Sequence, residues 1–92
     1  MKALHRVTEG EFVRVLETNS ITKLIAQEST EKPLKFVVLA INKHNHVAYA
    51  MRHGRTDSLR TWRLDNLAAF LKRHRITNFE VQYQDKVFRE RH

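Results

Sequence analysis

LKFVVLAI, residues 34–41, is the stretch of sequence that decides the fold. It contains the longest uninterrupted apolar run, the six residues from Phe36 to Ile41. This run is rich in β-branched and aromatic residues, which favour strands. Both of its alternating sets are apolar: Phe36, Val38 and Ala40 on one side, and Val37, Leu39 and Ile41 on the other. Because such strands are typical of the centre of a sheet, we predict a central strand with another element packed on each side.

The residues after this strand predict an antiparallel meander. The polar stretch NKHNH forms the expected hairpin loop. Residues 47–53 follow as a second strand, in which the small side chains of Ala48 and Ala50 suit close packing of a helix. Residues 54–58 predict a turn, and residues 59–63, LRTWR, predict a short third strand.

A helix and a further strand complete the pattern. Asp65 is expected to cap a helix over residues 66–75. The apolar stripe of this helix follows helical spacing and consists of Leu67, Phe70, Leu71 and His74, with Ala68 beside them. Residues 79–83 alternate apolar and polar side chains, which predicts a half-buried strand. Residues 84–88 are expected to hold a last turn and strand.

The N-terminal third predicts one or two helices. Thr8 and Glu11 fit a capping box, in which each side chain binds a free backbone N–H at the start of a helix. We therefore expect a helix over residues 9–18. A second apolar set, shifted in phase, predicts a helical segment over residues 20–28. The intervening TNS sequence either breaks or caps the first helix, so one bent helix is the alternative.

These elements predict a single α+β domain over residues 1–92. Its order is an N-terminal helix or helix pair, a three-stranded antiparallel sheet, a packing helix and a further strand, or α-β-β-β-α-β. Residues 1–7 and 89–92 are expected to fray. A domain of this size buries only about 60–65% of the surface that its unfolded chain exposes. A homodimer is a common remedy and is expected here.

The distribution of charge is the clearest functional signal. The net charge is +7, and residues 1–31 hold four Lys/Arg and five Asp/Glu, whereas residues 32–92 hold thirteen and five. A basic region of this kind predicts a polyanionic partner or an acidic protein surface, with a merely solubilising surface as the alternative. The longest apolar run is far below the about 20 residues of a membrane span. The N-terminus lacks the apolar core of a signal peptide, and no cysteine is present. We therefore expect a cytoplasmic protein without a membrane partner.

Seven basic residues are the candidate nucleic-acid contacts. Four of them flank Trp62 on the predicted second and third strands and the turn between them: Arg52, Arg55, Arg60 and Arg63. Arginine forks bind phosphate in a bidentate manner and stack on bases, although a solvated sheet face kept polar is the alternative. The other three end the second helix, Lys72, Arg73 and Arg75, where the helix dipole also explains cations. Trp62 itself is expected in the core.

The sequence predicts neither a metal site nor an enzyme. Of the six histidines, His44, His46 and His53 are the nearest approach to a cluster, and no cysteine is present to complete a zinc site. The carboxylates have local duties in turns and caps, and two glycines cannot form a glycine-rich phosphate loop. We expect no cofactor and no catalytic residues, with a small enzyme subunit as a distant alternative.

A family resemblance points in the same direction as the charge. Residues 47–72, which end LRTWRLDNLAAFLK, resemble the βββα arm-type DNA-binding unit of tyrosine recombinases. In that family the three-stranded sheet enters the major groove, which implies DNA-facing roles for Arg52 and Arg60, with Arg63 as a further candidate. The same stretch, continued to Val81, is similar to small plasmid partition-associated proteins.

The sequence therefore predicts a small accessory protein that binds nucleic acid, DNA rather than RNA, through a basic sheet face. The resemblance adds an association with a plasmid or mobile element. The alternative is a protein–protein interaction module, an adaptor or inhibitor that recognises an acidic partner surface or pairs through an exposed strand edge.

Overall fold

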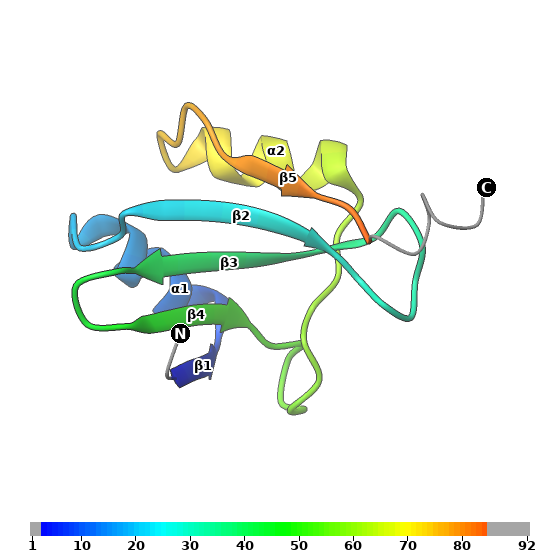
Figure 1. Cartoon of the computed structure of the whole chain (residues 1–92), viewed down its shortest axis with the longest axis horizontal. Coiled ribbons are helices and arrows are strands. Elements are labelled where there is room, and N and C mark those ends of the chain that lie inside the picture. The colour runs from blue at the N-terminus through cyan, green and yellow to red at the C-terminus, as the bar shows by residue number, and fades with distance from the viewer. Residues whose placement is uncertain (1–2, 85–92) are drawn as a thin grey trace.

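Five strands form one mixed sheet, and two helices pack against it, in the computed structural model, which describes residues 3–84. In chain order the elements are β1 (Ala3–Val7), α1 (Glu9–Glu17), β2 (Lys23–Glu28), β3 (Phe36–Asn42), β4 (Val47–Met51), α2 (Leu64–Arg73) and β5 (Glu80–Gln82). The strand order across the sheet is β1-β4-β3-β2-β5 (Figure 1). β2, β3 and β4 pair antiparallel, whereas the edge strands β1 and β5 pair parallel with β4 and β2. The predicted α+β class is confirmed, and β3 is the central strand.

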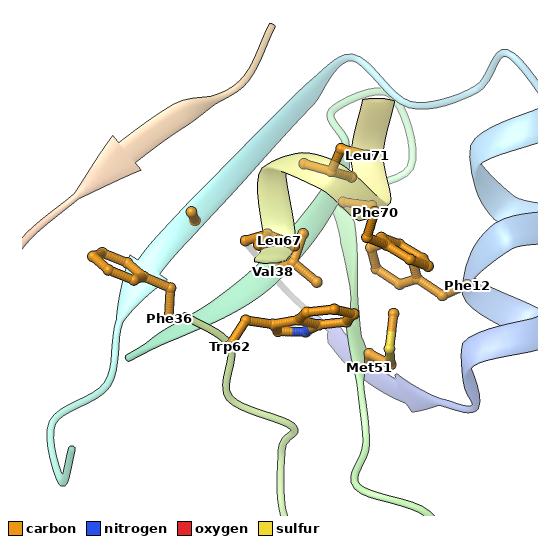
Figure 2. Packing of buried hydrophobic residues seen from close by; sticks show 10 residues of the cluster. Phe12, Phe36, Val38, Met51, Trp62, Leu67, Phe70 and Leu71 are labelled. Carbon is orange, nitrogen blue, oxygen red and sulfur yellow. The ribbon is translucent and has the colours of Figure 1, made fainter. Parts of the chain in front are cut away.

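Both helices cover the same face of the sheet and lie behind it in Figure 1. The core joins the inward side chain of Val38 in β3 to side chains of both helices, Phe12, Leu67, Phe70 and Leu71. Figure 2 shows these side chains converging in the space between the sheet and the helices. This side of the sheet is the inner face, and it holds the hydrophobic core.

No helix of residues 3–84 lies over the opposite side of the sheet (Figure 1). We call this side the open face, and its apolar side chains are Leu4, Ile25, Val37, Leu39, Ile41, Ala48 and Ala50. The prediction that an element packs on each side of the central strand is therefore wrong for the described residues. The alanine pair of β4 also belongs to this face, and not to a helix contact.

Several of the predicted elements are confirmed. The helix expected over residues 9–18 is α1, and its capping box is complete. The Thr8 N–H donates to Glu11 Oε1 at 2.8 Å, and the Glu11 N–H donates to Thr8 Oγ1 at 3.2 Å. The strands β3, β4 and β5 and the helix α2 also lie where hydrophobic periodicity places them, with boundaries shifted by a few residues.

The helical segment predicted over residues 20–28 is wrong, because Lys23–Glu28 is the strand β2. It pairs antiparallel with β3 along its whole length. Leu24 contributes to the core on the inner face, whereas Ile25 points to the open face. The apolar spacing that looks helical is that of a strand with apolar side chains on both faces. The frayed N-terminus is also wrong for Ala3–Val7, which forms the edge strand β1.

The predicted third strand and the predicted cap also need correction. Residues 59–63 form no strand and make only isolated bridges, Arg52 to Leu59 and Phe36 to Trp62. Asp65 does not cap α2. The N-cap residue is Arg63, without a side-chain cap hydrogen bond. The last strand predicted up to residue 88 and the frayed residues 89–92 fall largely or wholly outside the described residues. Within residues 3–84, neither helix is long and apolar enough to cross a membrane.

Candidate nucleic-acid interface

A hollow of about 400 Å³ lies between the start of α2 and the segment that leads into it. Its lining residues come from three parts of the chain, and we call it the basic hollow: Lys35, Arg60, Thr61, Trp62, Arg63, Asn66, Ala69 and Arg73. Four of these side chains are cationic, and within the described chain no carboxylate lines the hollow. The basic hollow is therefore a concave surface whose charged lining side chains are all positive within the described chain.

Backbone hydrogen bonds fix the segment that supplies two of these cations. The Arg60 N–H donates to the Met51 carbonyl at 2.8 Å, at the end of β4. Phe36 and Trp62 exchange two backbone hydrogen bonds of 2.8 Å each, at the start of β3. Backbone hydrogen bonds thus hold residues 60–62 against the end of β4 and the start of β3. The basic hollow is built on rigid elements of the scaffold, as a preformed site requires.

Trp62 is the floor of the basic hollow and part of the core. Its side chain is only 8% exposed, which confirms the core expectation. The Arg60 guanidinium lies 3.8 Å from the centre of the indole ring, and the Phe70 ring centre lies 5.1 Å from it. A cation over an aromatic face is held by the ring quadrupole. Trp62 therefore orients Arg60 and is not free to stack on a base.

The four cations differ in how they are neutralised. Arg60 forms an ion pair with Glu9 of 2.7 Å, and Arg63 forms a solvent-exposed pair with Asp65 of 3.0 Å. Exposed pairs of this kind contribute only about 0–1 kcal/mol and exchange readily with other anions. Lys35 makes no ion pair with any described residue, and neither does Arg73.

α2 places its contribution on one stripe. Asn66, Ala69 and Arg73 follow each other at helical spacing and face the basic hollow. The Arg73 guanidinium lies 6.0 Å from the centre of the Phe70 ring, so its stem rests on the core while its charge points outward. Ala69 leaves room between Asn66 and Arg73, because it carries only a methyl group.

The structure brings together three of the seven predicted contact residues, Arg60, Arg63 and Arg73. Lys35 completes the cluster and was missed by sequence analysis, because it stands alone in the sequence before the central strand. Lys72 is exposed on α2, but it does not line the basic hollow.

The other predicted contacts lie elsewhere. Arg55 is exposed on the turn after β4. Arg75 follows α2 with a left-handed backbone (φ 65°) and lines a separate hollow beside Leu24. Arg52 is half-buried at the end of β4, and its Nε has no hydrogen-bond partner among residues 3–84. The predicted convergence of Arg52 with Arg60 and Arg63 on one sheet face is not observed.

Arg52 instead acts on the start of α1. The hydrogen bonds from the Thr8 backbone and side chain lower the pKa of Glu11, and the charge of Arg52 adds to this effect. The Arg52 N–H also donates to the Val7 carbonyl at 2.8 Å. Arg52 is therefore tied to the junction of β1, α1 and β4.

Within residues 3–84, no three His, Cys, Asp or Glu side chains lie close enough to hold a metal ion. His44 and His46 are exposed in the turn between β3 and β4. His5 stacks on the ring of Tyr49, and His74 packs edge-to-face on the ring of Phe70. These four histidines are accounted for by the turn and by aromatic packing.

Comparisons with models of known protein families, with curated proteins and with solved structures found no match. The arguments about function therefore rest on the geometry and charge of the chain itself.

Proposed function

We propose that this protein binds nucleic acid, with duplex DNA as the preferred form, and that the four cations of the basic hollow contact successive backbone phosphates. The observation that carries the proposal is the convergence of Lys35, Arg60, Arg63 and Arg73 around one concave surface whose lining includes no carboxylate in the described chain. The sequence predicts that a basic sheet face binds nucleic acid. The surface proposed here lies instead beside α2.

The chemistry of the cations suits a phosphodiester. Arginine guanidinium groups bind two phosphate oxygens at once, while a lysine acts as a point charge. Asn66 and Thr61 add neutral donors at the same surface. Because Trp62 is buried under Arg60, we expect contacts to the backbone and not to the bases. Phosphate contacts position a protein without specifying sequence, so binding is expected to show little sequence preference.

The same proposal includes the cellular location of this activity, which is the cytoplasm. The net charge of +7 favours association with a polyanion over the whole surface, and a chain without cysteine suits the reducing cytoplasm. An association with a plasmid or mobile element rests on the sequence resemblance alone and stays a prediction, as does a homodimer.

The test is a salt titration with matched variants. Binding of the full chain to a fluorescent 20-base-pair duplex, to a single strand of the same sequence and to the RNA duplex is measured by anisotropy across a salt series. The logarithm of affinity falls with the logarithm of salt concentration, with a slope of about −0.9 per phosphate contact. We expect micromolar or tighter binding at low salt and a slope of about −3 to −4 for the DNA duplex.

The decisive variant pair removes the same charge from two places. Lys35→Ala with Arg73→Ala removes from the basic hollow the two cations that make no ion pair with any described residue, and the slope is expected to become shallower by about 2. Arg14→Ala with Lys43→Ala removes two exposed cations that do not line the hollow and serves as the control. An equal loss in both variants would overturn the assignment of the site. Absence of binding by the wild-type chain at about 50 mM salt would overturn the function itself.

A further inference from the structure

The open face is a continuous apolar surface on the side of the sheet away from the basic hollow. The strand register sets its residues in rows. Ile41 lies opposite Ala48 of β4 and Lys23 of β2. Leu39 lies opposite Ala50 of β4 and Ile25 of β2. The centre of the face is therefore apolar across three neighbouring strands.

Ile25, Ala48 and Ala50 of this face are buried, whereas the larger side chains of β3 are only partly covered. Val37, Leu39 and Ile41 are half-buried, and Leu4 at the β1 edge is 47% exposed. None of the three β3 residues belongs to the core cluster. Patches of this kind on a small protein are commonly interaction sites, because leaving them in water is unfavourable by roughly 25 cal/mol per Å².

Cations surround this apolar centre. Arg6 follows Leu4 on the same face of β1, opposite Ala50. At the far corner Lys23 pairs with Glu80 at 3.0 Å.

Lys43 reinforces the positive charge at that corner. The pKa of Glu80 is lowered mainly by its hydrogen bond to Lys23, with a further contribution from the charge of Lys43. Among the described residues, the cations of Arg6, Lys23 and Lys43 and the carboxylate of Glu80 thus border the apolar side chains. The rim of the open face is positive, and its natural complement is an acidic surface.

We propose that the open face is a docking site for an acidic amphipathic helix of a partner protein. A helix is about 10–12 Å wide and strands lie about 4.8 Å apart, so one helix covers two to three strands. Its apolar stripe would lie on Val37, Leu39 and Ile41, and carboxylates on its flanks would meet Arg6 on one side and Lys43 on the other. Helices with an apolar stripe at i, i+3, i+4 and i+7 bind apolar surfaces in this way.

Charge argues against a second copy of the chain as the occupant. Two open faces packed together would bring the cations of one rim against those of the other, in a protein whose net charge is already +7. Like charges juxtaposed at an interface cost several kcal/mol. The observed rim therefore favours a partner of opposite charge.

Nucleic acid is also a poor occupant of the open face. Proteins that bind single strands on a sheet stack bases on aromatic side chains. Among the described residues, the aromatic side chains of the strands lie on the inner face, as Phe36 and Tyr49 do. The open face offers aliphatic side chains instead. It lies on the side of the sheet opposite α2 and the basic hollow, so the docking proposal stands without the nucleic-acid function.

The test is a selection followed by affinity measurements on the full chain. A displayed library of 18-residue helical peptides carries an apolar stripe and, at every flanking position, an unbiased choice of Glu, Gln or Lys. Peptides are selected on the wild-type protein and their affinities are then measured by anisotropy. We expect enrichment of Glu over Lys on both flanks. Bound peptide is expected to shift backbone amide NMR signals of β2, β3 and β4 and to leave those of α2 unchanged.

Three variants sharpen the selection. Leu39→Thr with Ile41→Thr keeps strand-forming residues and is expected to weaken binding at least tenfold. Arg6→Glu with Lys43→Glu is expected to weaken acidic peptides at least tenfold and to strengthen their lysine counterparts. Arg14→Glu with Lys72→Glu makes the same change of charge on the helices and is expected to leave affinity within about twofold. Circular dichroism verifies that each variant is folded.

Several results would overturn the proposal. One is failure to enrich any helix, and another is enrichment without a preference for Glu. Equal affinity for the Leu39→Thr, Ile41→Thr variant would exclude the apolar contact. A concentration-dependent dimer that this variant abolishes would assign the face to a second copy. Loss of duplex binding in the same variant would assign it to nucleic acid.

Discussion

The two faces of the central strand carry similar side chains in different surroundings. On the inner face Val38 is 1% exposed beneath both helices. One residue earlier, Val37 points to the open face and is half-buried. The same residue type therefore contributes to the fold on one side and is available for contact on the other. Hydrophobicity along a strand shows that both faces avoid water, but it does not show which face the chain itself covers.

The largest expected difference between the faces is in the cost of removing a large side chain. Phe70 of α2 is 1% exposed and packs on Trp62. Phe70→Ala is expected to destabilise the protein by about 3–5 kcal/mol, because it leaves a cavity in the core. Leu39→Ala on the open face is expected to cost about 1 kcal/mol or less, because Leu39 leaves no enclosed cavity. Urea denaturation of both variants measures the two free energies. Similar losses would show that the open face is as tightly packed as the core.

A second, smaller difference in stability is expected between two valines of β3, one on each face of the sheet. Val38→Thr places a hydroxyl in the core without a partner and is expected to cost about 1–3 kcal/mol. Val37→Thr makes the same chemical change on the open face and is expected to alter stability by about 0.5 kcal/mol or less, because water reaches the hydroxyl. Thermal denaturation of the pair gives the difference directly. A destabilised Val37→Thr protein would mean that the open face is covered in solution.

The elements that the sequence predicts well are those whose signal is local. α1 has its capping box between Thr8 and Glu11, and α2 has a single apolar stripe. β2 was predicted as a helix because Leu24 and Ile25 are both apolar, one for each face of the sheet. Only pairing with β3, the next strand along the chain, decides in favour of a strand. β1 is short and largely exposed, and its pairing partner β4 lies about forty residues later, so no local pattern indicates it.

The candidate site shows the same limit. Arg60, Arg63 and Arg73 were predicted because each lies in a local cluster of basic residues. Lys35 lies far from these three arginines in the sequence. The backbone hydrogen bonds between Phe36 and Trp62 bring it to the basic hollow. Long-range pairing decides which cations meet, and composition alone cannot.

The end of β2 provides a polar contrast on the inner face. Glu28 is only 4% exposed, and its carboxylate accepts the Leu34 N–H at 2.7 Å and the Gln84 N–H at 2.9 Å. The hydrogen bond from Gln84 and then that from Leu34 lower the pKa of Glu28, against the opposing effect of burial. Since the folded state holds the charged form, its stabilising effect is complete above the unfolded pKa of about 4.3. It is lost as the pH falls through the lower folded pKa.

Glu28→Gln is therefore expected to lower the melting temperature at pH 7, and the gap to wild type is expected to close as the pH falls from about 5 to 3. Differential scanning calorimetry across this range measures the gap. Glu31→Gln changes an exposed carboxylate in the following loop and is the matched control, with little change expected at any of these pH values. A gap that widened in acid would contradict the assignment, because it would require a raised pKa.

The smallest expected effect is a gain in the free energy of unfolding, and it concerns Arg63, which precedes α2 and lines the basic hollow. Arg63 occupies the N-cap position of α2, yet it makes no side-chain cap hydrogen bond. Serine is among the preferred residues there, because its hydroxyl accepts a free N–H of the first turn. Arg63→Ser is expected to stabilise the protein by about 0.5–1 kcal/mol, reduced by the loss of the exposed pair with Asp65.

The same variant is expected to weaken duplex binding and to make its salt slope shallower by about 1. Chemical denaturation and the salt titration measure both quantities on one sample. A more stable protein that binds less tightly would show that this cation serves binding at the expense of the fold, whereas unchanged binding would remove Arg63 from the interface.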